Sequence, residues 1–155
     1  MREVRRHALV AHTPAEMYAL VNNVARYPEF VPWCRRAQVQ AESDTAMTAT
    51  LELARAGLHL TLTTDNRLAP GERIEMRLRD GPLASFRGLW RFVPIHAPPA
   101  SAGASRMLAG CRVELEVDFE FKGSMSGLLL GPWFEASWNS LVDAFVRRAA
   151  EIYGG

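Results

Sequence analysis

Hydrophobic and polar residues alternate one by one through most of the middle of the chain. The clearest run is Val113–Phe121, in which five apolar residues are separated by four acidic ones. Successive side chains of a β-strand point to opposite faces, so this pattern predicts a strand with one covered and one wet face. Runs with the same period occur at 47–53, 58–62, 74–78 and 86–92. Together they predict an antiparallel sheet whose apolar face is covered by another element.

A short helix is predicted near the N-terminus. After a first strand at 3–11, expected near a sheet edge, Thr13 and Glu16 form a capping-box signature, and Pro14 suits the first helical position. This helix is expected to end at Pro28, because proline lacks the N–H that a helix interior requires.

A long helix is predicted at the other end of the chain. Pro132 either begins this helix or kinks a longer one that starts near Ser124. Only this helix is long enough to cover the apolar face of the sheet, which predicts an α+β fold. In this fold a curved antiparallel sheet of about six to seven strands wraps around the helix, with one or two short helices after the first strand. Such a grip leaves a cavity unless large side chains fill it. The apolar residues that recur every three or four positions are Phe134, Trp138, Leu141, Phe145, Ala149 and Ile152.

The length and the remaining segment complete the expected organisation. A chain of 155 residues is expected to form one domain over 1–155. Residues 94–110 show no period and are rich in Ala, Pro, Ser and Gly. They predict a mobile loop inserted between the two strands of a hairpin.

Composition and charge exclude several classes of function. The formal net charge is +1, so binding to nucleic acid or anionic lipid must depend on a local patch. No apolar run approaches the ~20 residues of a membrane span, and the start of the chain lacks a signal-peptide core. A cytoplasmic location is therefore predicted, with peripheral contact at the inner membrane face as an alternative. The histidines lack metal-ligand spacing, no catalytic motif is present, and Cys34 and Cys111 are expected to be reduced structural thiols.

The acidic residues of Val113–Phe121 allow two interpretations. A row of carboxylates can bind cations or transfer protons. Strand alternation instead places them on the wet face, and solvated acids are not tuned for catalysis. On that face, arginines of neighbouring strands can pair with them, namely Arg73, Arg77, Arg87 or Arg91. No catalytic residue is therefore predicted.

The segment 26–36 (RYPEFVPWCRR) concentrates aromatic residues where no long helix can form. Pro28 and Pro32 disrupt helical geometry, yet Tyr27, Phe30 and Trp33 lie between them or beside them. These aromatic residues either fill a gap in the core or form an apolar rim around a bound molecule. Because further aromatic residues occupy the covered face of the sheet and the long helix, a pocket for a small hydrophobic ligand is one possible result.

Several local phrases resemble a known family. The chain is similar over about residues 2 to 153 to the coenzyme Q-binding START-like proteins, within the polyketide cyclase/START-like superfamily. The resemblance implies a helix-grip fold whose apolar cavity holds a lipid-like quinone without catalysis. It also implies a second role, because bacterial members include ribosome association toxins of the RatA type, described as binding the large ribosomal subunit and blocking subunit association. The phrases are Asn22-x4-Tyr27-Pro-x-Phe30-x-Pro32-x-Cys34, Ala56-Gly57, Asp80-Gly-Pro82, Gly88-x-Trp90-x-Phe92, Asp118-Phe-Glu-Phe121 and Ala144-Phe145.

The leading hypothesis is a non-enzymatic chaperone for a hydrophobic ligand, ubiquinone or a similar isoprenoid lipid, supporting respiratory electron transport. The alternative is a RatA-type toxin that binds the large ribosomal subunit, and the third choice is a polyketide cyclase-like enzyme. No cofactor is required by the leading hypothesis. The predicted ligand-binding residues are Tyr27, Phe30, Val31, Trp33, Leu60, Met76, Trp90, Phe92, Phe119, Phe121, Leu129, Trp133, Phe134 and Trp138. The predicted ribosome or phospholipid contacts are Arg2, Arg5, Arg6, Arg35, Arg36, Arg87 and Arg91.

The two interpretations of segment 26–36 predict different mutant phenotypes. If Phe30 and Trp33 border a cavity mouth, Phe30→Ser or Trp33→Ser should weaken ligand or membrane binding more than it lowers stability. If both fill the core, folding should be lost while binding by the folded fraction persists. Ligand binding and chemical denaturation of each variant separate the two.

Overall fold

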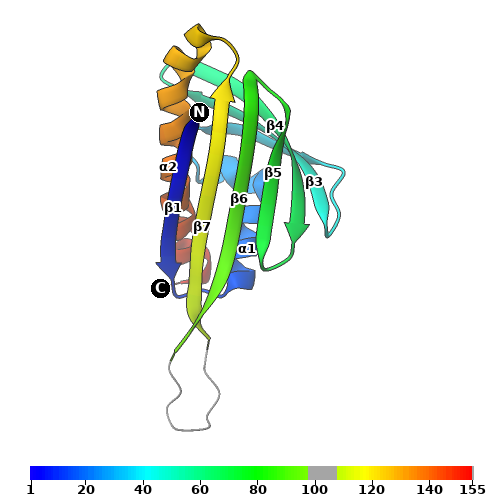
Figure 1. Ribbon diagram of the computed structural model, residues 1–155. Coiled ribbons are helices and arrows are strands. Elements are labelled where there is room, and N and C mark those ends of the chain that lie inside the picture. Colours follow the sequence, from blue (N-terminus) through cyan, green and yellow to red (C-terminus); the bar gives the residue numbers. More distant parts are fainter. Residues whose placement is uncertain (98–107, 155) are drawn as a thin grey trace.

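The computed structural model describes residues 1–97 and 108–154, which form one sheet and its covering helices (Figure 1). Each element follows the periodicity of its residues, and most begin or end at a proline, glycine or cap. The elements in chain order are β1 (Arg2–Val10), α1 (Pro14–Asn22), the 3₁₀ helix η1 (Val24–Glu29), β2 (Cys34–Gln40), β3 (Ala46–Arg55), β4 (Leu58–Ala69), β5 (Arg73–Asp80), β6 (Leu83–His96), β7 (Leu108–Phe121) and α2 (Ser124–Tyr153).

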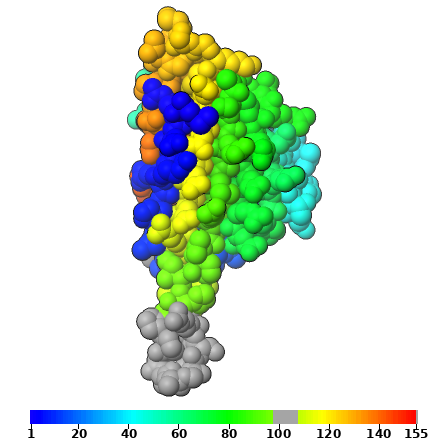
Figure 2. All heavy atoms as spheres, viewed as in Figure 1, coloured from blue at the N-terminus to red at the C-terminus, as the bar shows by residue number. Residues whose placement is uncertain are grey.

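The strands form a seven-stranded antiparallel sheet in the order β1-β7-β6-β5-β4-β3-β2. The first strand pairs with the last, and the remaining neighbours are consecutive in the chain. As Figure 1 shows, α2 runs along one face of the sheet behind β1 and β7. We call this the inner face and the opposite one the outer face, part of which Figure 2 shows as a continuous surface. The predicted α+β helix-grip fold is confirmed, as is the edge position of the first strand.

Aromatic side chains join α2 to the inner face. Phe134 of α2 is fully buried and meets Phe119 of β7 edge-on, with 4.7 Å between ring centroids. Trp138 lies 5.3 Å from Phe86, and Phe145 lies 5.4 Å from Trp90, both of these partners being in β6. Edge-to-face contacts at such distances add to the free energy gained by burying the rings. The apolar face predicted from alternation is therefore the one that α2 covers.

The first helix differs from its prediction at its C-terminal end. The capping box forms as expected, with Thr13 Oγ accepting from the Glu16 N–H and the Glu16 carboxylate accepting from the Thr13 N–H. The α-helix nevertheless ends earlier, at Asn22. Pro28 lies within η1 and is not the residue that ends the α-helix. A short 3₁₀ turn tolerates proline because few of its N–H groups have partners within the turn.

The structure determines where the last helix begins and where the predicted loop before it lies. The last helix begins at Ser124, with Pro132 inside it, so the longer of the two predicted helices is the one that forms. The predicted loop at 94–110 was wrong at both ends, because β6 continues to His96 and β7 begins at Leu108. Its central residues, 98–107, lie outside the described part of the chain.

Small residues concealed the ends of this hairpin. Strand pairing continues through Pro94 and Gly110, which carry no strand-like side-chain pattern. Glycine is required at position 110, since an added Cβ there would lie 2.1 Å from the Val10 carbonyl oxygen of β1. The composition suggested a loop here. In the structure, glycine instead allows the backbones of two paired strands to approach closely.

The segment 26–36 fills the core beneath α2 with most of its aromatic residues. Trp33 is 2% exposed and packs against Trp138, and its Nε1–H donates to Ser140 Oγ at 3.0 Å. Tyr27 is buried, and its hydroxyl donates to the Val21 carbonyl. This placement favours the core-packing interpretation for Tyr27 and Trp33.

Trp33→Ser is therefore expected to lower the free energy of unfolding by about 3–5 kcal/mol, because it leaves a cavity and removes the partner of Ser140. Leu129→Ser is the matched control, since this predicted ligand residue is 62% exposed, and its change should stay within about 0.5 kcal/mol. Urea unfolding followed by tryptophan fluorescence measures both. Equal stability of the two variants would show that Trp33 does not act as a core residue.

Candidate ligand cavity and charged outer face

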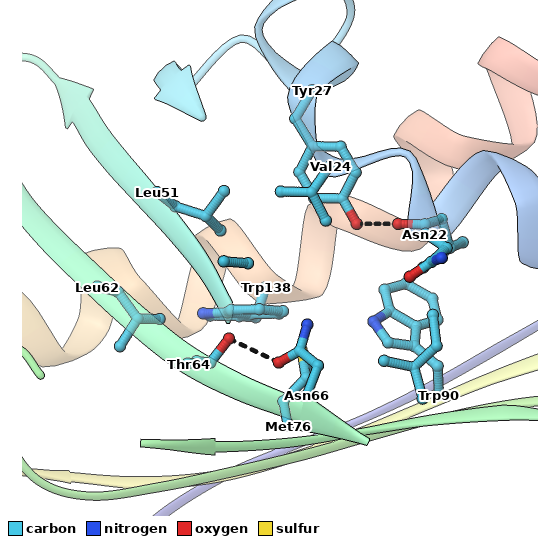
Figure 3. Close-up of a pocket in the computed structure, with 13 residues that line it drawn as sticks. Asn22, Val24, Tyr27, Leu51, Leu62, Thr64, Asn66, Met76, Trp90 and Trp138 are labelled. Carbon is cyan, nitrogen blue, oxygen red and sulfur yellow. Dashed lines mark hydrogen bonds between the residues drawn. The ribbon is translucent and has the colours of Figure 1, made fainter. Parts of the chain in front are cut away.

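A small cavity lies between α2, the 3₁₀ helix and the inner face of the sheet (Figure 3). Its free space is about 20 Å³, close to the minimum that holds one water molecule. Large side chains therefore fill most of the space that the grip could leave open. The lining residues are Val21, Asn22, Val24, Tyr27, Ala49, Leu51, Leu62, Thr64, Asn66, Ile74, Met76, Trp90 and Trp138.

The cavity wall is mostly apolar, and six of its side chains carry a polar atom, namely Asn22, Tyr27, Thr64, Asn66, Trp90 and Trp138. Thr64 Oγ donates to Asn66 Oδ1 at 2.7 Å, and both side chains are buried. Figure 3 shows the Asn66 amide nitrogen turned away from this bond and into the cavity. Asn22 Oδ1 and Trp138 Nε1 are buried without a hydrogen-bond partner among the described residues. One is an acceptor and the other a donor, so a small neutral molecule carrying both functions would satisfy them.

The structure brings only some of the predicted ligand residues to this cavity. Tyr27, Met76, Trp90 and Trp138 line it. Phe30 and Trp133 are half-buried, and Leu129 is exposed on the first turns of α2. The others lie in the packed core away from the cavity, namely Val31, Trp33, Leu60, Phe92, Phe119, Phe121 and Phe134.

Sequence reasoning missed the polar residues of the cavity. Thr64 and Asn66 have the same parity along β4 as Leu60 and Leu62, so alternation already placed them on the inner face. Polar residues at covered positions were the available signal. Asn22 stood within the family phrase but was not assigned to a site.

No group suited to acid–base chemistry lines the cavity. The lining residues include no carboxylate, histidine, lysine or arginine, and burial raises the pKa of the Tyr27 hydroxyl. Burial also raises the pKa of both thiols, Cys34 and Cys111, to about 11. Within residues 1–97 and 108–154 no cluster of potential ligands can hold a metal ion. The cavity therefore suits a neutral ligand or dense packing better than catalysis.

The acidic row of β7 lies on the outer face, as alternation predicts, but its partners differ from those expected. Asp118 accepts from Arg5 of β1 at 2.9 Å, and Glu114 accepts from Arg112 of its own strand at 2.6 Å. None of the arginines expected from β5 and β6 forms an ion pair with this row within 4.0 Å. The interstrand pairing alone could not decide which neighbour each carboxylate would choose.

The seven arginines predicted to contact a ribosome or phospholipid do not form one cluster. Three of them lie on β1: Arg2 pairs with Glu135 at 3.4 Å, Arg5 with Asp118, and Arg6 with Asp143 at 3.1 Å. Arg36 pairs with Glu52 at 3.4 Å. The other three form no salt bridge within the described residues, namely Arg35, Arg87 and Arg91. In the same part of the chain, no helix has the length and apolar character needed to cross a membrane.

A comparison with protein families matches residues 10–146 to the family of polyketide cyclases/dehydrases and lipid transport proteins. The chain belongs to this family. The fold is shared by solved structures of low sequence identity. A Thermus thermophilus protein has a TM-score of 0.78 at 17% identity, covering 97% of this chain and 98% of its own. The ZhuI aromatase/cyclase of a Streptomyces species has a TM-score of 0.74 at 20% identity, covering 99% and 98%.

Some curated proteins are more similar to the chain in sequence. The ribosome association toxin RatA of Vibrio cholerae is 41% identical over 154 residues, or 99% of both chains. The protein of the same name from Pseudomonas aeruginosa is 37% identical over 97% of both. The coenzyme Q-binding protein COQ10 homolog B of Xenopus laevis is 29% identical over 90% of this chain and 54% of its own. The suspected relationship is confirmed. The chain is more similar in sequence to the RatA proteins than to the coenzyme Q-binding protein.

The raised thiol pKa values predict slow chemical modification. At pH 8 a thiol with a pKa of about 11 holds about a hundredfold less thiolate than a free cysteine. A disulfide reagent should therefore react with Cys34 and Cys111 at least about a hundredfold more slowly in the native than in the urea-unfolded protein. Equal rates in the two states would show that a thiol is accessible and available as a nucleophile.

Proposed function

We propose that this protein is a RatA-type ribosome association factor, which binds the large ribosomal subunit in the cytoplasm and keeps the small subunit from joining it. The observation that carries the proposal is the 41% identity to a RatA protein along 99% of both chains. The similarity to a coenzyme Q-binding protein is weaker and covers only 54% of that protein.

The interior of the protein also supports this order of the two functions. Burying an isoprenoid chain contributes about 0.8 kcal/mol per methylene, so roughly ten buried carbons are needed for micromolar affinity. A cavity of about 20 Å³ holds none of such a chain while the aromatic side chains keep their positions. Docking through the surface requires no such opening. The cavity lining contains no carboxylate, histidine, lysine or arginine, which supports a role as a binding protein rather than an enzyme.

Binding to isolated subunits tests the proposal directly. At low salt the purified protein should sediment with large subunits in a sucrose gradient and not with small subunits. Added to a mixture of both, it should reduce the fraction that forms complete ribosomes. Failure to sediment with large subunits at low salt would sink the proposal.

A second candidate function is carriage of a neutral hydrophobic molecule, ubiquinone included. The specific observation in its favour is that two side chains of a mostly apolar cavity lining, Asn22 and Trp138, have polar atoms, Oδ1 and Nε1, without a hydrogen-bond partner among the described residues. A ligand carbonyl could accept from the Trp138 N–H once the surrounding side chains moved apart. A core with two unsatisfied polar atoms is less costly to open than a fully apolar one.

Filling the cavity separates the two functions. Ala49 lines the cavity and is 3% exposed, whereas Ala54 on the same strand is half-buried outside it. Ala49→Leu should abolish retention of any co-purified quinone, measured by mass spectrometry of an organic extract, and leave ribosome binding unchanged. Ala54→Leu is the control and should change neither. If the native protein retains no quinone and binds none added in detergent, the carrier function is excluded.

A further inference from the structure

Four arginines of β5 and β6 stand in two like-charged pairs on the outer face. The strand register places Arg73 directly opposite Arg91 and Arg77 directly opposite Arg87. All four side chains are exposed. Directly opposite residues have their Cβ atoms about 5 Å apart, and like charges in such positions repel. The two pairs are four residues apart along the strands, or about 13 Å.

The carboxylates directly opposite Arg77 and Arg87 are ion-paired with other arginines, and Glu116, which lies opposite Leu89, forms no ion pair within 4.0 Å among the described residues. Strand pairing puts Asp65 opposite Arg77, and it puts Asp118 opposite Arg87. Both carboxylates are held by other arginines, because Arg79 donates to Asp65 at 3.0 Å and Arg5 to Asp118 at 2.9 Å.

The second pair is in a similar position. Glu114, which faces Arg91, accepts from Arg112 at 2.6 Å. Glu75 lies between the two pairs and reaches Arg73 at 3.5 Å, in a partly exposed contact that contributes little. Within the described residues, Arg77, Arg87 and Arg91 form no ion pair at all. We call these three residues together with Arg73 the arginine quartet.

A shallow hollow adjoins one of the two arginine pairs. Arg77 and Arg87 line a shallow hollow of about 530 Å³ between β5 and β6, which Asp118 borders on its β7 side. In Figure 2 these strands form the green surface next to the yellow β7. Leu89, the apolar residue between the two pairs, is half-buried. Among the residues that line the hollow, Met1 is the large apolar side chain that is exposed, and a single such side chain offers little surface for insertion into a lipid bilayer.

We propose that the arginine quartet is the surface through which this protein contacts the phosphate backbone of folded RNA. Each guanidinium pair can hold one phosphate through two-pronged hydrogen bonds, and the phosphate charge relieves the repulsion within the pair. Structured RNA is recognised mainly through its phosphates, sugars and shape, which requires no pocket for a base. The inference rests on the proposed function and adds to it the surface that meets the ribosome.

The matched test compares two double variants with the same change in net charge. Arg77→Gln/Arg87→Gln alters the quartet. Arg55→Gln/Arg147→Gln alters two exposed arginines that lie elsewhere and form no ion pair within the described residues. Affinity for large ribosomal subunits, and for a generic RNA duplex by fluorescence anisotropy, is measured from low to moderate salt.

The quartet variant should bind about tenfold or more weakly at 100 mM salt, and the slope of log affinity against log salt should fall by about 1, because Arg77 and Arg87 together hold one phosphate. The control should change affinity by less than about twofold. Thermal unfolding of the quartet variant should occur at the same or a higher temperature, because repulsion between the strands is relieved. Loss of binding with gain of stability is not expected of a merely structural residue.

Other outcomes separate this inference from the proposed function. If subunits are bound but both double variants weaken binding equally, the quartet is not the contact surface, whereas the proposed function stands. If the native protein binds the RNA duplex through the quartet but not large subunits, the inference stands and the proposed function fails. If it binds neither, the inference is overturned. Tighter quartet-dependent binding to phosphatidylglycerol vesicles than to RNA would overturn it in favour of a membrane surface.

Discussion

The contact between α2 and the inner face of the sheet governs the rest of the structure. Phe134, Trp138 and Phe145 project from one side of this helix and meet aromatic residues of β6 and β7 at centroid distances of 4.7 to 6.1 Å. Burying these rings contributes much of the free energy that holds the helix against the sheet. The same contact fills the space that a grip would otherwise enclose. It therefore determines both the fold and the small size of the cavity.

A filled interior changes how the fold relates to function. A solved structure with the same fold is named as an aromatase/cyclase, and relatives in sequence are named as a toxin and a coenzyme Q-binding protein, so the fold alone does not select among these roles. Here the polar side chains of the cavity are short or uncharged, and two of their atoms remain unsatisfied. Charged side chains instead lie at the surface, where the ten ion pairs of the described residues are at least partly exposed, some on the outer face of the sheet and others at α2 and η1. The chemistry available for recognition is therefore mostly external.

The sequence predicts well which face of the sheet a side chain occupies, but poorly whether that side chain lines the cavity or packs away from it. Alternation identified which residues of Val113–Phe121 point inward, because parity is a property of the strand itself. It could not show that Trp90 lines a cavity while Phe92, on the same face, does not, since that depends on how far α2 lies from each row. The sequence left the start of α2 open between Ser124 and Pro132, because a proline can either begin or kink a helix. It also missed the strand at Gly110, where glycine allows the Val10 backbone to approach closely.

Electrostatics on the outer face depends on register in the same way. Parity placed the acids of β7 and the arginines of β6 on one surface, and simple neutralisation was the natural expectation. Strand register and the length of the side chains instead allow Asp118 to form an ion pair with Arg5 and Glu114 to form one with Arg112. This leaves Arg77 directly opposite Arg87 and Arg73 directly opposite Arg91. Repulsion of this kind lowers stability, yet a single glutamate in place of either arginine of a pair would turn it into attraction. An arrangement that costs the free protein stability is best understood through the anion that would bind there.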